Sequence, residues 1–282
     1  MNLPPRPESR DQPLATKTEI GSDTDRERPP QLSLAAILAI WCAAAIPMPV
    51  LAFAVAPALA ERTGMMPGIA LLLCMIAGMM WQFVLAICLL QRERRLAGGR
   101  THWRDQVWWR SPAEPGTGRR RPVLLLWVIP ILGATFLIEA TGIGELLARW
   151  LELLVPALGD VPVPDIKQLV DPALHGAWWL IPVMLTACLF NYALGEALLF
   201  HGYLMPRMQG AFGRFDWVWN GVVFGGYHLI RPLTIPSIML TGMIWAYVSI
   251  RYRSSQIAIY THAVDALFVM GLTIGVVTGA LP

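Results

Sequence analysis

Long apolar runs dominate the chain after about residue 30, and their lengths suit a lipid bilayer. A membrane-crossing helix needs ~20 consecutive, mainly apolar residues. The spans that this pattern predicts lie near residues 33–58, 67–91, 122–144, 177–204, 217–231, 234–251 and 256–281. The fifth is short and carries Asp216 and Arg231 at its ends, so its limits stay open. We therefore expect an all-α polytopic membrane protein with about seven transmembrane helices, the last four forming one bundle.

Composition supports this class and removes others. The chain of 282 residues is 55% hydrophobic and 15% charged, whereas soluble domains are about 45–50% apolar and about 25% charged. A net charge of +3 indicates no nucleic-acid partner. Residues 1–30 combine six acids, five bases and six prolines without apolar periodicity, which predicts a disordered tail.

The loops between the predicted spans differ in charge, and this difference predicts an orientation. Residues 92–121 hold nine arginines against three acids, whereas residues 139–176 hold six acids against two bases. Positively charged loops stay in the cytoplasm. We therefore expect a cytoplasmic N-terminus, a cytoplasmic segment 92–121 and an external segment 139–176 in a multi-pass protein, with a bacterial cytoplasmic membrane as its expected location. Residues 31–176 would supply the first spans, and residues 177–282 the bundle that carries the chemistry.

Three of the last four spans each contain an ionisable residue, namely Glu196, His228 and His262. Ionisable groups inside a membrane are costly, so they are functional-site candidates. At a rise of about 1.5 Å per residue, the three lie at similar depths on the cytoplasmic side. Glu196 and His228 can share a water and remove its proton, and His262 can donate to a developing oxyanion. Asp265 shares a helix face with His262 and can orient it.

His201 also lies in the fourth span, five residues after Glu196. On an α-helix this spacing turns the side chain by about 140°, so the two residues would face apart. From the spacing, His201 is as readily a structural residue as a functional one.

The motifs resemble those of the CPBP intramembrane protease family, the CAAX-protease and bacteriocin-processing (Abi-type) group that includes the Ras-converting CAAX endopeptidase. The family's Glu-Glu-x-x-x-Arg reads Glu196-Ala197-Leu198-Leu199-Phe200-His201 here, its Phe-x-x-x-His reads Phe224-Gly225-Gly226-Tyr227-His228, and its His-x-x-x-Asn reads His262-Ala263-Val264-Asp265-Ala266. The resemblance covers about residues 177–270. It implies an intramembrane endopeptidase in which Glu196 and His228 activate water and His262 supports the oxyanion.

Several alternatives stay open. The chain departs from the motifs at Ala197, His201 and Ala266, so a second hypothesis is a pseudoprotease that acts as a membrane binding or immunity protein. A third, for which no paired repeats are visible, is a small proton-coupled transporter.

Cofactor and partner expectations follow the first hypothesis. Family naming allows a zinc ion, but no His-Glu-x-x-His pair is present, so we expect no obligatory metal. The expected partners are membrane lipids and a peptide or protein substrate in the membrane, which the resemblance extends to lipidated proteins. We expect that substrate to use a cavity on the cytoplasmic side. The sequence assigns no oligomeric state.

Overall fold

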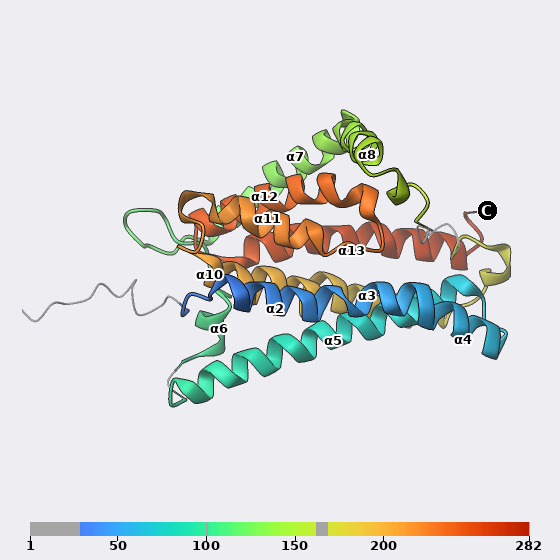
Figure 1. The fold of residues 1–282 in the computed structure, drawn as a ribbon, viewed down its shortest axis with the longest axis horizontal. Helices are drawn as coiled ribbons and strands as arrows, with labels where there is room; N and C mark the ends of the chain where they lie inside the picture. Colours follow the sequence, from blue (N-terminus) through green and yellow to red (C-terminus); the bar gives the residue numbers. More distant parts are fainter. Residues whose placement is uncertain (1–28, 100, 162–168, 282) are drawn as a thin grey trace, which may run out of the picture.

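The computed structural model describes residues 29–99, 101–161 and 169–281. The predicted disordered tail, residues 1–30, lies almost wholly outside this range, as does part of the acidic segment 139–176. Helices make up nearly all of the regular structure in the described residues, which confirms the expected all-α fold (Figure 1). Six helical segments there are long and apolar enough to cross a membrane: Leu34–Thr63, Pro67–Leu96, Pro122–Ala140, Leu180–Met208, Pro232–Arg251 and Ser255–Val277.

The first two of these segments form an antiparallel pair. The first consists of α2 (Leu34–Ala45), α3 (Pro47–Val50), the π-helical η1 (Leu51–Val55) and α4 (Ala56–Thr63). Gly64 ends it with a left-handed φ of 68°, a conformation that glycine adopts without steric cost. The second is the continuous helix α5 (Pro67–Leu96). The Gly64 turn therefore brings α5 back alongside the first segment.

The third segment joins the 3₁₀ turn η2 (Pro122–Trp127) to α7 (Val128–Ala140). A turn at Gly142 then leads into α8 (Ile143–Leu154). Exposed apolar side chains such as Leu146, Trp150 and Leu153 lie on α8. A helix of this kind, placed directly after a membrane span, suits the interface between membrane and water.

The fourth segment is interrupted near its middle. It runs through α9 (Leu180–Leu189), the π-helical η6 (Phe190–Leu194), the π-helical η7 (Leu198–Leu204) and α10 (Met205–Met208). Glu196 lies in the short stretch between η6 and η7. Single π-helical turns inside α-helices frequently mark functional sites.

The predicted fifth span is a shorter helix than expected. Helix α11 (Asp216–Gly226) has 11 residues, which cover ~16 Å and cannot cross a hydrocarbon core of ~30 Å. The chain leaves the helix at Tyr227 and returns through η9 (Pro232–Thr234) into α12 (Ile235–Arg251). Irregular backbone at membrane depth is tolerated where it lines a cavity.

Close packing of α11 against α12 depends on glycine. Gly221 and Gly225 form a G-x-x-x-G pair on α11, and a Cβ at either would lie 2.6 Å from a backbone nitrogen of α12, that of Met243 or Met239 respectively. Small residues at this spacing let helix backbones approach closely in membranes. The contact fixes the end of α11, where Phe224 and His228 lie.

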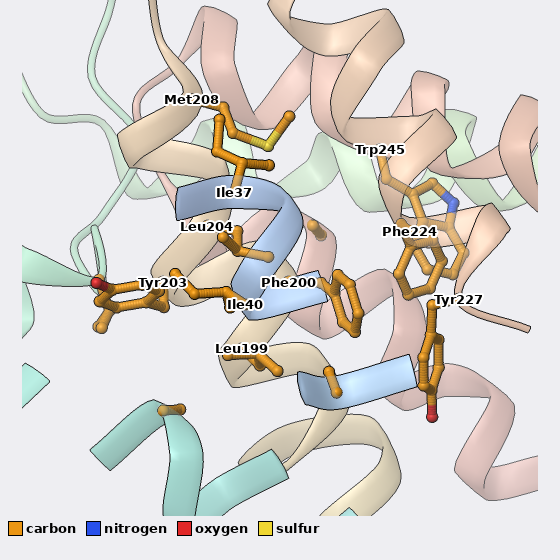
Figure 2. Close-up of a cluster of buried hydrophobic side chains, with 14 of the residues drawn as sticks. Ile37, Ile40, Leu199, Phe200, Tyr203, Leu204, Met208, Phe224, Tyr227 and Trp245 are labelled. Carbon is orange, nitrogen blue, oxygen red and sulfur yellow. The ribbon is translucent and has the colours of Figure 1, made fainter. Parts of the chain in front are cut away.

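The last helix is α13 (Ser255–Val277). The largest cluster of buried apolar side chains fills the half of the bundle near α10, and Figure 2 shows part of it. At the same end of the bundle, the buried Arg207 guanidinium forms a bidentate ion pair with Glu93 at 2.5 and 2.8 Å. Tyr203 also donates to Glu93, at 2.7 Å. This polar group ties the end of α5 to the end of the fourth segment.

Candidate active site

The break in the fourth segment places Glu196 inside the bundle. Gly195 has φ −88° and ψ −92°, and its amide donates to the Phe190 carbonyl at 2.7 Å. A Cβ at Gly195 would lie 2.6 Å from that same carbonyl oxygen. Only glycine therefore fits this turn without a shift of the backbone. The Glu196 side chain that follows is 5% exposed.

His228 lies just beyond the end of α11, on the irregular stretch that leads to α12. Its Nδ1 is 3.2 Å from the Phe224 carbonyl oxygen. A carbonyl only accepts hydrogen bonds, so this contact places a proton on Nδ1, and in the neutral ring Nε2 then carries the lone pair. Nε2 is 3.8 Å from Glu196 Oε1. The Phe-x-x-x-His spacing thus sets both the position of the ring and its tautomer.

His262 reaches the same carboxylate from α13. Its Nε2 is 3.4 Å from Glu196 Oε1, and its Nδ1 is 3.6 Å from Asp265 Oδ2. His262 is buried, whereas the Asp265 side chain is 53% exposed. The structure therefore brings together all four predicted site residues: His228 and His262 converge on Glu196, and Asp265 lies on the outer side of His262. The 3.8 Å between Glu196 Oε1 and His228 Nε2 exceeds a direct hydrogen bond, and a water that contacts both atoms would bridge them.

A cavity of about 620 Å³ opens in front of these residues. Apolar side chains from α5, α9, α12 and α13 form most of its wall, and the polar ones gather around Glu196. Concave, mainly apolar sites with a few converging polar groups are typical of ligand and substrate sites. Its size and lining suit a short stretch of peptide.

Phe224 organises the rings around the site. Its ring centroid lies 5.4 Å from that of His228, 5.9 Å from His262 and 4.7 Å from His201. Trp245 on α12 completes this aromatic group, 5.2 Å from His262. Edge-to-face and tilted ring contacts at these distances are favourable. They hold the imidazole rings in fixed orientations.

The expectation that His201 faces away from the site is wrong. Its ring lies 6.4 Å from the His262 ring and packs against Phe224 and Trp245. The physical reason is η7, because π-helical hydrogen bonds join residues five apart and bring such residues toward one face. His201 is fully buried and, among the described residues, neither ring nitrogen has a hydrogen-bond partner.

The expectation that the cavity lies on the same side as the arginine-rich segment is also wrong. The sequence placed site and cavity on the cytoplasmic side, the side assigned to residues 92–121. The cavity is lined by Gly68, Glu139 and Leu169, which lie toward the other end of the bundle. The helical rise gave comparable depths, but it could not show which side of Glu196 is packed and which is open.

Several polar residues near the site were missed. Tyr192 packs edge-on to His262 at 4.8 Å, and Tyr227 lines the cavity beside His228. Gln82 on α5 is fully buried, and in the described part of the chain its amide atoms have no hydrogen-bond partner. A lone glutamine inside an apolar span was the available signal for Gln82, whereas tyrosines in apolar runs carry no such signal.

A family model covers this part of the chain. Residues 177–278 match the model described as type II CAAX prenyl endopeptidase Rce1-like. The match covers 102 of the 282 residues, and we call this matched stretch the Rce1-like segment. The Rce1-like segment contains Glu196, His228 and His262, and it extends from just before α9 to the end of α13. Comparisons with curated proteins and with solved structures gave no match.

A metal site would need several His, Cys, Asp or Glu side chains gathered around one point. Within the described ranges, no group of three or more His, Cys, Asp or Glu side chains is arranged to hold a metal ion. Glu196, His228 and His262 can act as acid–base groups without a metal ion.

Proposed function

We propose that this integral membrane protein is an intramembrane endopeptidase that uses Glu196 and His228 to activate water. The observation that carries the proposal is the convergence of His228 Nε2 and His262 Nε2 on one oxygen of Glu196, at 3.8 and 3.4 Å, at the inner end of the cavity. Three different elements supply these groups. The match of residues 177–278 to CAAX prenyl endopeptidases supports peptide hydrolysis as the reaction class.

The proposed reaction begins with a water held between Glu196 and His228. Glu196 accepts a proton from this water, the His228 Nε2 lone pair accepts its second hydrogen bond, and the water oxygen attacks the peptide carbonyl carbon. The C–N bond then breaks, and the proton held by Glu196 passes to the departing amine. General acid–base catalysis of this kind contributes about 10²–10⁴-fold.

His262 has the second role in the proposed reaction. Nε2 of a protonated His262 would donate to the oxygen of the tetrahedral intermediate, and stabilisation of such an oxyanion is often the largest catalytic contribution. Asp265 Oδ2, 3.6 Å from Nδ1, would fix the orientation of the ring. Asp265 is thus a positioning residue in this scheme.

The proposal extends to partners and location. The cavity walls are mainly apolar, so a substrate peptide within the membrane, lipidated or not, is the proposed partner, and lipids surround the spans. No metal is required, because the two imidazoles and the carboxylate supply the acid–base groups. A bacterial cytoplasmic membrane with the N-terminus in the cytoplasm remains the proposed setting.

A second candidate function is a pseudoprotease that binds peptides without turnover. The observation that favours it is the loss of polar motif residues at two positions. Ala197, at the position of the second motif glutamate, is fully buried, and Ala266 packs beside an apolar cluster of α5 and α9. The cavity would persist in such a protein.

Purified protein in detergent or liposomes, incubated with a library of labelled peptides, separates the two functions. Cleavage by the wild-type protein and its loss in Glu196→Gln is the expected result. Glu61→Gln removes an exposed carboxylate at the end of α4 and serves as the matched control with normal cleavage. Binding of peptides without cleavage by the wild type would support the pseudoprotease instead.

A further inference from the structure

The arginine-rich segment, residues 92–121, marks one end of the bundle. Arg207 at the end of the fourth segment donates to the Gln106 carbonyl at 2.8 Å. Ser254, between α12 and α13, donates to the Arg110 carbonyl at 2.6 Å, and the Ser255 amide donates to the Trp108 carbonyl at 3.1 Å. In Figure 1, α6 and α10 accordingly lie at one end of the bundle and α4 at the other.

The cavity occupies the half of the bundle away from this end. On α5, a helix that extends to Leu96, the lining residues run only from Gly68 to Met79. On α12 they lie between Ser237 and Trp245, and the part of the helix that leads to Arg251 contributes none. The lining residues of α7 (135–139), of α9 and η6 (184–192) and of α13 (262–272) also lie away from the arginine-rich end.

The mouth of the cavity is polar and accessible. Glu139 and Arg231 are exposed residues of its lining, and so is Asp265. Leu169, which belongs to the acidic segment 139–176, also lines the cavity. The rim is therefore built at the end of the bundle that carries the acidic segment.

Tightly packed side chains form a floor that closes the cavity on the side facing the arginine-rich segment. Directly beyond Glu196, the side chains of Leu199, Phe200, Tyr203 and Leu204 are 0–2% exposed. Ile37 and Ile40 of α2 pack into the same cluster, as Figure 2 shows. Interiors packed in this way hold few voids larger than a water molecule. A peptide arriving from the arginine-rich side would have to displace this floor.

We propose that the substrate reaches Glu196 only from the membrane face opposite the arginine-rich segment. By the positive-inside rule this face is extracytoplasmic. The substrate class is then a protein whose scissile bond has been translocated, such as an exported protein or the outward part of a membrane protein. The inference rests on the proposed function in taking the occupant of the cavity to be a peptide.

Thiol labelling tests the route without requiring proteolysis. In a background with all four cysteines replaced by alanine, Ser237→Cys places a nearly isosteric thiol in the cavity wall. Thr117→Cys marks the arginine-rich side and Thr141→Cys marks the other, because both threonines are exposed. A charged, membrane-impermeant methanethiosulfonate is added to either face of sealed vesicles. Thr241→Cys, one turn deeper in the cavity, repeats the test if Ser237→Cys folds poorly.

The expected result is that Ser237→Cys and Thr141→Cys react from one face and Thr117→Cys from the other. Reaction of Ser237→Cys from the Thr117 face, or from neither face, would overturn the proposed route. The outcomes for function are separate. The expected labelling without any peptide cleavage would refute the endopeptidase and leave the route intact, whereas cleavage with reversed labelling would refute the route alone.

Discussion

Replacement of Gly195 by alanine should disable the site without touching a reacting group. An added Cβ would lie 2.6 Å from the Phe190 carbonyl oxygen and closer still to the Met79 carbonyl oxygen, although real Cβ atoms essentially never approach below 3.0 Å. Both obstacles are backbone atoms, so no side chain can turn aside to make room. Relief therefore requires a shift of η6 against α5, and Glu196 follows directly in the chain.

The magnitude follows from two known effects. Overpacking of this kind costs about 1–3 kcal/mol of stability, which exceeds the gain of up to ~1 kcal/mol that alanine brings to a helix. A displacement of ~1 Å at a catalytic group can cost about 10²-fold in rate. We therefore expect Gly195→Ala to lower the unfolding midpoint and to reduce cleavage about 10²-fold while the protein remains folded.

Thermal unfolding in detergent and initial cleavage rates measure the two effects separately. Gly271→Ala is the matched control, because a Cβ there meets nothing within 4 Å. It should leave cleavage unchanged and stability equal or slightly higher. If Gly195→Ala matched Gly271→Ala in both measurements, the argument that the Gly195 turn positions Glu196 would fail.

Three further predictions concern the chemistry. Glu196→Gln, His228→Ala and the double variant should each lose at least about 10²–10⁴-fold in cleavage rate. The losses should be similar because the effects of removing two groups that act on one water are not additive. A double variant whose loss equals the product of the two single losses would show that the residues act independently. His201→Arg, which restores the motif residue, should lower both stability and cleavage, since it places a larger charged group at a fully buried site between Phe224 and Trp245; a thermal midpoint and rate equal to those of wild type would contradict this. Cleavage should persist after dialysis against a chelator, and activity that disappears and returns with added zinc would refute the metal-free proposal.

The fold class was predictable because span length and apolarity are local properties of a chain. Five of the six membrane-length segments in the described residues start within two residues of their predicted positions, and the segment that begins at Leu180 starts three residues late. The interruption at Glu196 was not predictable, because a π-helical turn conserves composition and changes only the hydrogen-bond register. Helix α11 was also expected to be longer, because the apolar pattern continues past its end. Nothing in the apolar pattern shows that the chain leaves the helix at Tyr227.

The site was predictable in its members and less so in its geometry. Glu196, His228 and His262 stood out as ionisable groups in apolar spans, and the structure places both imidazoles within 3.8 Å of the Glu196 carboxylate. The place of His201 depends on a helix type that residue spacing cannot reveal. The open side of the cavity depends on long-range packing of α2 against η7, which no local pattern encodes.

The packed floor beneath Glu196 also has a consequence for the membrane as an electrical barrier. A cavity that admits water past the middle of a bilayer leaves only the remaining thickness to block ions and protons. In this protein that thickness is the layer formed by Leu199, Phe200 and Leu204, all fully buried. The same side chains that stop a peptide therefore maintain the resistance of the membrane, and a gap in this layer would let protons leak through the protein.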